Sequence, residues 1–129
     1  MISFQDFRQT DGTPIYLQII RYIQQGLAAG TIQDGDELPS RRVVSALLAV
    51  NPNTVQKAFR LLEDEGLVTS RAGAKSYIQA TPEQIDALRR ELLETEMQAM
   101  VDAARRMGLT REDAHRLLDT LYDREGTDA

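Results

Sequence analysis

The chain has 129 residues, no cysteine and a formal net charge of −5. Its length allows one small domain, or a small domain with an appendage, and the lack of cysteine excludes disulfides, thiolate metal sites and a cysteine nucleophile. The first residues lack the basic and apolar regions of a signal peptide, and no apolar run approaches the length of a membrane span. We therefore expect neither secretion nor membrane insertion, and a reducing cytoplasm is the expected compartment.

The negative charge is unevenly distributed. Residues 1–80 contain eight Lys or Arg and eight Asp or Glu, whereas residues 81–129 contain seven Arg and twelve acidic residues. No carboxylate occurs between Ser40 and Arg60. Because phosphates respond to charge within a Debye length, the first part of the chain remains compatible with a nucleic-acid partner.

A first helix is predicted after an irregular segment, residues 1–12, from which Ile2, Phe4 and Phe7 could pack onto the body. Thr13 followed by Pro14 is typical of a helix start, with the proline at the first helical position. Gly30 is placed to cap the end of this helix, and residues 31–37 are expected to form a turn-rich connection. A buried stripe is predicted at Ile15, Ile19, Ile20, Ile23 and Leu27.

Two further helix starts lie about a dozen residues apart. Ser40 is a preferred N-cap ahead of an apolar run at 43, 44, 47 and 48, and Asn51 followed by Pro52 opens the next helix. Only a turn around Ala49 and Val50 separates the two helices, which indicates a helix-turn-helix. The apolar face of its second helix is predicted at Val55, Ala58, Phe59 and Leu62.

The polar face of that second helix suggests what the unit binds. Asparagine, glutamine, threonine, lysine and arginine side chains reach base edges and phosphates in a major groove. The candidate DNA-binding residues on this helix are Asn53, Thr54, Gln56, Lys57 and Arg60. At the start of the preceding helix the candidates are Ser40, Arg41 and Arg42, and it stays open whether Arg41 neighbours a phosphate or faces solvent.

A hairpin is predicted next, with strands at 67–70 and 76–79 and a glycine, Gly73, in the turn. Gly66 is expected to end the helix before it. Helix, helix-turn-helix and hairpin follow one another in the order of a winged helix. Arg71 and Lys75 are expected at the wing tip, where they could touch DNA; the alternative is that they merely solubilise the edge of a small sheet.

The C-terminal part reads as two helices. Residues 81–84 form a capping-box pattern that opens a long helix to about residue 107, and Thr110 opens a last helix in which Ala114, Leu117, Leu118, Leu121 and Tyr122 are expected to be buried. Two such helices cannot bury their apolar stripes against each other alone, so we expect a twofold dimer. Its candidate interface residues are Ile85, Leu88, Leu92, Met97, Met100, Val101, Leu117 and Leu121.

The predicted fold is therefore mostly α with a small β-hairpin. Residues 1–79 are expected to form a winged helix-turn-helix DNA-binding domain, and residues 80–129 a C-terminal helical dimerisation or effector region.

Several segments carry a family resemblance in addition: PIYLQI (14–19), LPSRR (38–42), VNPNTVQKAF (50–59), LEDEGLV (62–68) and a wing segment at 71–78. On these segments the chain resembles the GntR family of bacterial transcriptional regulators, and within it the YtrA subfamily, whose short two-helix tail it shares. The resemblance implies a dimeric repressor that binds a palindromic operator, often beside genes for an ABC transporter.

The resemblance also implies roles for single residues. It implies that Arg42 contacts DNA, that Asn53, Thr54 and Gln56 lie on the recognition helix, and that Gly73 shapes the wing. Family members often carry arginine where this chain has Pro52 or Gln56, which leaves the base preference open. Lys75 replaces the second wing glycine and adds a charge.

Other classes of function fit less well. The only histidine, His115, is expected at a surface or interface, and no phosphate loop or catalytic motif occurs, so neither an enzyme nor a metal or cofactor site is predicted. A winged helix that binds protein rather than DNA is the serious alternative, and substitution of Arg42 and Lys57 would separate the two. Whether an effector exists, and which one, stays open, because two helices are too small to enclose a typical ligand pocket in one protomer.

Overall fold

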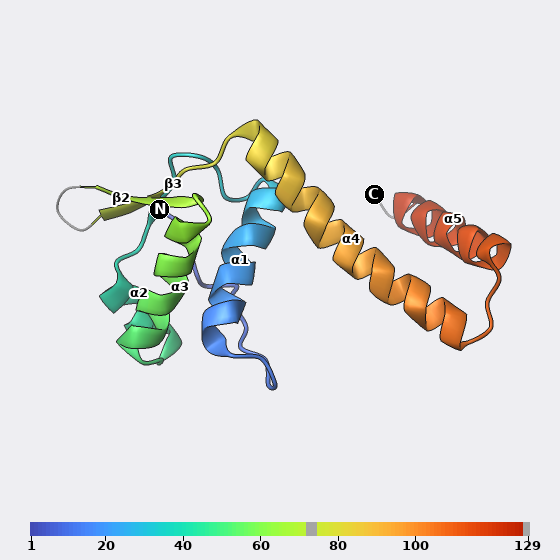
Figure 1. The fold of residues 1–129 in the computed structure, drawn as a ribbon, viewed down its shortest axis with the longest axis horizontal. Coiled ribbons are helices and arrows are strands. Elements are labelled where there is room, and N and C mark those ends of the chain that lie inside the picture. The colour runs from blue at the N-terminus through green and yellow to red at the C-terminus, as the bar shows by residue number, and fades with distance from the viewer. Residues whose placement is uncertain (72–74, 128–129) are drawn as a thin grey trace. The chain divides into compact units, whose positions relative to one another are not determined.

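The computed structural model describes residues 1–71 and 75–127. In chain order the elements are α1 (Ile15–Ala29), β1 (Glu37–Leu38), α2 (Arg41–Leu48), α3 (Pro52–Asp64), β2 (Val68–Arg71), β3 (Lys75–Ile78), α4 (Pro82–Arg106) and α5 (Arg111–Thr127) (Figure 1). The chain divides into two compact units, Met1–Arg90 and Glu91–Ala129. The predicted fold class, mostly helical with a small sheet, is confirmed. None of the helices within residues 1–71 and 75–127 offers an apolar stretch that could span a membrane.

Helix α3 is the centre of the first unit. It contacts α1, α2 and β2, and its apolar face is buried as predicted. The predicted stripe of α1 is buried as well, except at Ile15, which is half-buried. The side chains that are almost completely shielded from solvent are Ile19, Ile23, Leu27, Val44, Val55, Phe59, Leu62 and Ile78.

Of the three helix starts predicted within residues 1–79, two are confirmed. The Ser40 hydroxyl accepts a hydrogen bond from the Val43 amide at 3.1 Å, and Asn51 Oδ1 accepts one from the Asn53 amide at 2.8 Å. The prediction for α1 was wrong in detail, because Pro14 itself occupies the N-cap position and no side chain caps this helix. A buried glutamine holds the segment before α1 in place instead. The amide nitrogen of Gln18 donates to the carbonyl oxygens of Thr10 and Thr13, at 2.9 and 2.7 Å.

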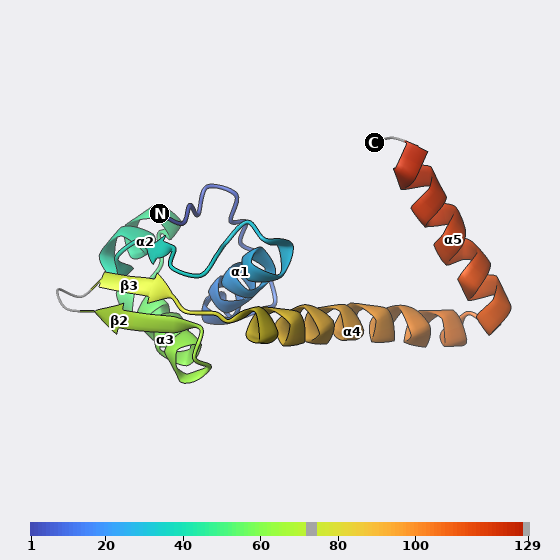
Figure 2. The same ribbon diagram turned by 90° about the horizontal axis from the view of Figure 1, so that it is seen from above.

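The sheet has three strands rather than the predicted two. β3 lies in the middle and pairs antiparallel with both β1 and β2; Figure 2 shows β2 and β3 side by side next to α3. β1 was missed because two residues are too short to show an alternating pattern, and their partners Ser76 and Tyr77 are distant in sequence. The Ile2 amide donates to the Glu37 carbonyl at 2.9 Å, so the N-terminal segment is tied to the edge of this sheet.

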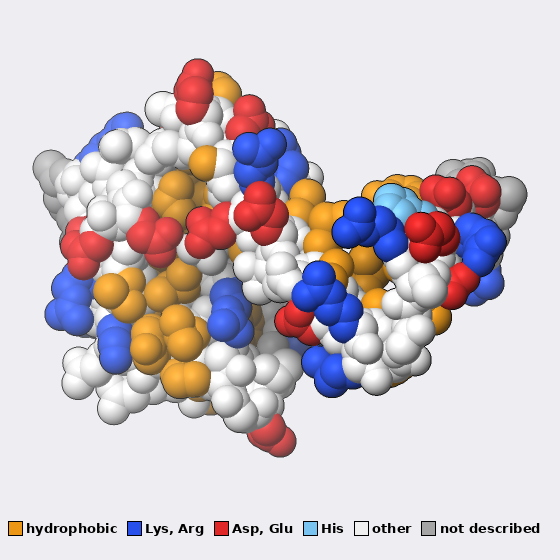
Figure 3. Space-filling model, turned by 45° about the vertical axis from the view of Figure 1, so that its right-hand side comes forward, with side chains coloured by type: hydrophobic (Ala, Val, Ile, Leu, Met, Phe, Trp, Pro, Cys, Tyr) orange, Lys and Arg blue, Asp and Glu red, His pale blue; other side chains and the backbone are white. Residues whose placement is uncertain are grey.

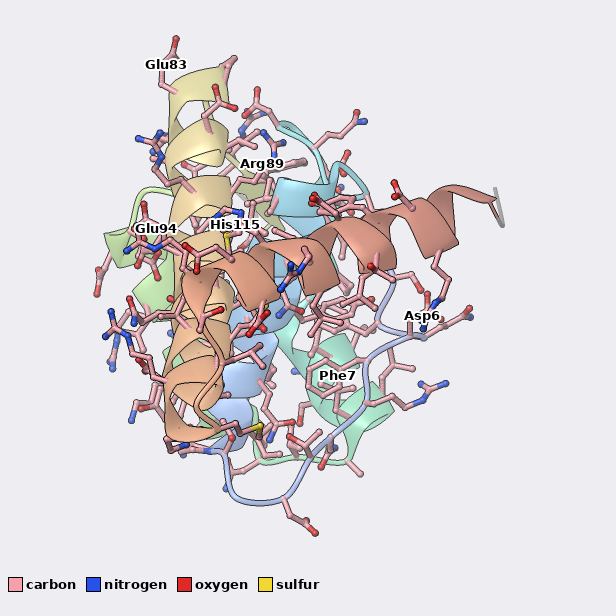
Figure 4. All side chains as sticks on the ribbon, turned by 90° about the vertical axis from the view of Figure 1, so that its right-hand side faces the viewer. Asp6, Phe7, Glu83, Arg89, Glu94 and His115 are labelled. Carbon is pink, nitrogen blue, oxygen red and sulfur yellow. The ribbon has the colours of Figure 1, made fainter. Side chains whose placement is uncertain are left out.

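The N-terminal segment packs onto the body as expected. Phe4, Phe7 and Tyr22 form an aromatic cluster with ring centroids 5.1 to 6.2 Å apart, and Phe7 is buried (Figure 4). The Tyr22 hydroxyl donates to the Ser3 carbonyl at 2.7 Å. Burial, with a smaller effect of Asp6, raises the pKa of the Tyr22 phenol.

The start of α4 belongs to the first unit. Its capping box is confirmed: the Thr81 amide donates to Gln84 Oε1 at 2.8 Å, and the Gln84 amide donates to Thr81 Oγ1 at 3.2 Å. Leu88 is buried, and Arg89 Nε donates to the carbonyl of Ala28, the penultimate residue of α1, at 3.0 Å (Figure 4).

The second unit consists of α4 from Glu91 onward together with the whole of α5. Thr110 Oγ1 accepts a hydrogen bond from the Asp113 amide at 3.1 Å, so the predicted start of α5 is confirmed. The expectation that the apolar residues of α5 are buried was wrong for the single chain. Leu117, Leu121 and Tyr122 are exposed, and Ala114 and Leu118 are only half-buried, because the chain supplies too little surface to cover them.

Candidate nucleic-acid interface

The first turns of α3 present a polar face to solvent. Asn53, Gln56 and Arg60 are exposed, and Thr54 is half-buried. Within the described part of the chain, the side chains of Asn53, Gln56 and Arg60 make no hydrogen bond, ion pair or ring contact. Their opposite face is anchored in the core by the apolar stripe of the same helix. These groups are therefore held on a rigid element but remain available to a ligand.

Lys57 is the exception on this face, because it has an intramolecular partner. Its Nζ atom lies 4.0 Å from the centroid of the Tyr16 ring, a cation–π contact between α3 and α1. Tyr16 is half-buried. Its role was missed because periodicity marks only the buried face of α1, although Tyr16 lies within the PIYLQI segment.

The two arginines at the start of α2 are placed differently. Arg42 is exposed, and its side chain makes no hydrogen bond, ion pair or ring contact within the described residues. Arg41 is half-buried: its guanidinium lies 3.5 Å from Glu63 Oε1 and 5.4 Å from the centroid of the Phe59 ring. This geometry favours Arg42 as a ligand contact and gives Arg41 an internal partner. The hydroxyl of Ser40, also exposed, is used to cap α2.

The predicted wing residues sit opposite each other where β2 ends and β3 begins. Arg71 lies over the Tyr77 ring with its guanidinium carbon 4.5 Å from the ring centroid, and Lys75 Nζ lies 3.7 Å from Glu37 Oε1. Both side chains are exposed. Gly73 lies outside the described residues.

Arg42, Asn53, Gln56 and Arg60 leave cationic and amide groups exposed on α2 and α3. Cationic and amide side chains on a rigid helix can pair with phosphates and base edges. Within residues 1–71 and 75–127, no group of His, Asp and Glu side chains is placed to hold a metal ion.

A second candidate surface lies on the C-terminal unit. α4 and α5 line a cleft of about 550 Å³, with Met97, Met100, Val101 and Leu118 among its walls. Figure 3 shows hydrophobic side chains gathered beside the single histidine, which also lines this cleft.

The predicted interface residues are distributed unequally between the two units. Met97, Met100, Val101, Leu117 and Leu121 are between 39 % and 52 % exposed. Ile85 and Leu92 are half-buried. Leu88 is only 9 % exposed, because it packs within the first unit, so it offers little surface to a partner.

The chain is similar in sequence to known bacterial regulatory proteins. The model of the family described as bacterial regulatory proteins, gntR family, matches residues 15–78. The chain is 35 % identical over 100 residues to YhcF of Bacillus subtilis (strain 168), an uncharacterised HTH-type transcriptional regulator. This match covers 78 % of this chain and 83 % of YhcF. It is 42 % identical over 66 residues to the HTH-type transcriptional repressor YtrA of the same strain, about half of each chain.

A solved structure shows the same fold over nearly its whole length. It is a GntR family transcriptional regulator from Listeria monocytogenes, with a TM-score of 0.78 and 27 % sequence identity. The match covers 87 % of this chain and 98 % of the Listeria chain, and so includes residues beyond the winged-helix unit.

Proposed function

The chain belongs to the gntR family of bacterial regulatory proteins, transcriptional regulators with a DNA-binding helix-turn-helix, and from this premise we propose that it is a repressor that binds a palindromic operator as a homodimer. It is thus a regulator and not an enzyme. The likeness to YtrA, which is named a repressor, supports the same role here. An operon for an ABC transporter, as the resemblance implies, is the proposed target.

The observation that carries the proposal is the free polar face of α3. Asn53, Gln56 and Arg60 are exposed and unpartnered within the described residues, and so is Arg42 at the start of α2. We propose that α3 enters the major groove, where asparagine and glutamine read base edges. Arg42 and Arg60 contact phosphates, and the wing residues Arg71 and Lys75 reach the flanking backbone.

The dimer is proposed from the apolar surface of the C-terminal unit. Side chains such as Met97, Met100 and Leu117 are about half exposed in the single chain. Contiguous exposed apolar surface of this kind is typical of protein interfaces, and burial stabilises an interface by roughly 25 cal/mol per Å² of apolar area. The C-terminal region of one protomer therefore packs against that of a second copy.

A twofold dimer determines the form of the operator. Two copies of α3 related by a twofold axis read the two halves of a palindrome, with half-site centres about 10 bp apart or a multiple of it. Occupation of such a site near a promoter excludes RNA polymerase, which is the proposed mechanism of repression. Any effector binds at the dimer interface or against the winged helix, and acts by changing the separation or tilt of the two winged-helix units.

The proposal is tested by binding to the DNA upstream of the protein's own coding region. Fluorescence anisotropy at two salt concentrations, with scrambled DNA of the same length as control, separates specific from non-specific binding. Saturable binding of two chains to one site, preferred over the scrambled DNA, is the expected result. Equally weak binding to both DNAs that is abolished by modest salt would contradict the proposal.

One observation favours a second candidate function, the protein-binding winged helix. Val43 and Leu47 lie one helical turn apart on α2 and are 47 % and 65 % exposed, although apolar. A partner protein could cover them. Replacing both Arg42 and Lys57 by alanine separates the candidates, because a DNA-binding protein loses DNA binding while its fold and dimer persist.

A further inference from the structure

Glu63 joins three elements of the winged-helix unit. It lies in the last turn of α3, and its Oε1 atom is 3.5 Å from the guanidinium of Arg41, the first residue of α2. The same Oε1 atom accepts a hydrogen bond at 2.7 Å from the hydroxyl of Ser70, in strand β2. One carboxylate oxygen therefore connects the recognition helix, the helix before it and the first strand of the wing.

The surroundings make this connection more than an ordinary surface ion pair. The side chains of Arg41 and Glu63 are only 29 % and 34 % exposed, and the Arg41 guanidinium also stands over the Phe59 ring. Arg41 Nε is buried without a hydrogen-bond partner among the described residues. Among the described residues no other acidic side chain forms an ion pair with Arg41, so losing Glu63 would leave a partly buried charge unpaired.

We propose that Glu63 is a positioning residue, which holds the wing and the start of α2 in a fixed geometry relative to the recognition helix. The proposal rests on the proposed function, because this geometry matters for simultaneous contacts of α3 and the wing with one operator. Glu63 does not touch DNA itself. It determines whether Arg42, which follows Arg41, and Arg71, which follows Ser70, reach the backbone while α3 reads the groove.

The sign of the effect distinguishes positioning from simple electrostatics. A carboxylate near a DNA-binding surface repels phosphates, so its removal alone should strengthen binding to every DNA sequence. Loss of a positioning group should instead weaken binding to the operator, while binding to unrelated DNA is kept or strengthened. The two explanations therefore predict opposite changes in operator affinity.

The experiment compares Glu63→Ala with Asp64→Ala in the full-length protein. Asp64 is the exposed neighbour on the same helix, and it makes no hydrogen bond or ion pair within the described residues, so its replacement changes the net charge equally. We expect Glu63→Ala to lose about tenfold in operator affinity, roughly the value of one base contact, without losing affinity for scrambled DNA. Asp64→Ala should bind both DNAs at least as well as wild type. Equal behaviour of the two variants would overturn the proposal.

Two more variants keep the test decisive if Glu63→Ala is poorly folded. Ser70→Ala removes the link to the wing without changing any charge, and its exposed side chain is not required by the core. It should lose operator affinity in the same direction, about threefold, for one hydrogen bond. Glu63→Gln keeps an acceptor for Ser70 and should retain more operator affinity than Glu63→Ala. Wild-type operator affinity in Ser70→Ala would overturn the proposal.

A measurement without DNA separates failure of this inference from failure of the proposed function. In amide NMR spectra of the free protein, Arg41→Ala should shift the Ser70 signal, and the shift should vanish in a Glu63→Ala background. Coupling of this kind without specific DNA binding by the wild type would contradict the proposed function alone. Absence of the coupling would overturn the positioning role, whatever the protein binds.

Discussion

The ammonium group of Lys57 lies 4.0 Å from the centre of the Tyr16 ring, and this contact joins the proposed recognition helix to α1. Lysine side chains have considerable rotamer entropy. A ring that already fixes the ammonium group therefore reduces the conformational entropy that the side chain loses when a phosphate binds. Tyr16 is therefore expected to support DNA binding through Lys57.

Replacing Tyr16 by leucine should weaken operator binding. The substitution keeps the apolar bulk against the core but removes the cation–π contact, worth about 0.5–1 kcal/mol at exposed sites, so affinity should fall about threefold. Tyr16→Phe keeps the ring and should bind as the wild type does. An unchanged affinity of Tyr16→Leu in anisotropy titrations would show that the contact has no role in binding.

The neighbours Arg41 and Arg42 should respond differently to alanine substitution. Arg42→Ala removes an exposed cation that has no partner among the described residues, so the slope of log affinity against log salt should become shallower by about 1. Arg41→Ala removes the internal partner of Glu63, so its salt slope should stay unchanged while thermal stability falls. Identical salt slopes for the two variants would contradict the assignment of Arg42 to a phosphate.

A charge in the apolar surface of the C-terminal unit should dissociate the dimer. Leu117 is 52 % exposed in the single chain, and Leu117→Glu would bury a carboxylate in the proposed interface, which is strongly unfavourable. Sedimentation should show a shift from twice 14.5 kDa to 14.5 kDa. Glu96→Gln, at an exposed position of α4, is the control and should remain dimeric. A Leu117→Glu variant that stays dimeric would place the interface elsewhere.

Gly26 illustrates how packing can reverse a helix propensity. Alanine is favoured over glycine inside a helix by about 1 kcal/mol, but a Cβ at Gly26 would clash with Ile32 Cδ1 and lie 2.7 Å from Ile32 Cγ1. Overpacking of this kind typically costs about 1–3 kcal/mol, so Gly26→Ala should lower the Tm. In an Ile32→Ala background the same substitution should raise it. Thermal unfolding of the four proteins checks both signs.

Features that depend on neighbouring residues could be predicted from the sequence. The caps at Ser40, Asn51 and Thr81 are examples, because a side chain and the amide it bonds lie within three residues. The buried faces of α1 and α3 follow in the same way from the helical period.

Features that depend on distant partners could not be predicted. β1 exists because Glu37 and Leu38 pair with Tyr77 and Ser76. The local sequence of either segment does not indicate that it pairs with the other. The same holds for Arg41: its place could not be decided from sequence, since its partner Glu63 comes from the far end of the next helix. Lys57 looked like a free surface cation for the same reason.

We expect two copies of α3 to read one operator in successive major grooves. Hydroxyl-radical footprinting of the protein on its own upstream DNA tests it most directly. The expected pattern is two symmetric protected segments whose centres are about 10 bp apart or a multiple of it, and protection should disappear with Leu117→Glu at concentrations that saturate the wild type. A single protected segment that the Leu117→Glu variant reproduces would contradict the claim, because the protein would then bind DNA as a monomer.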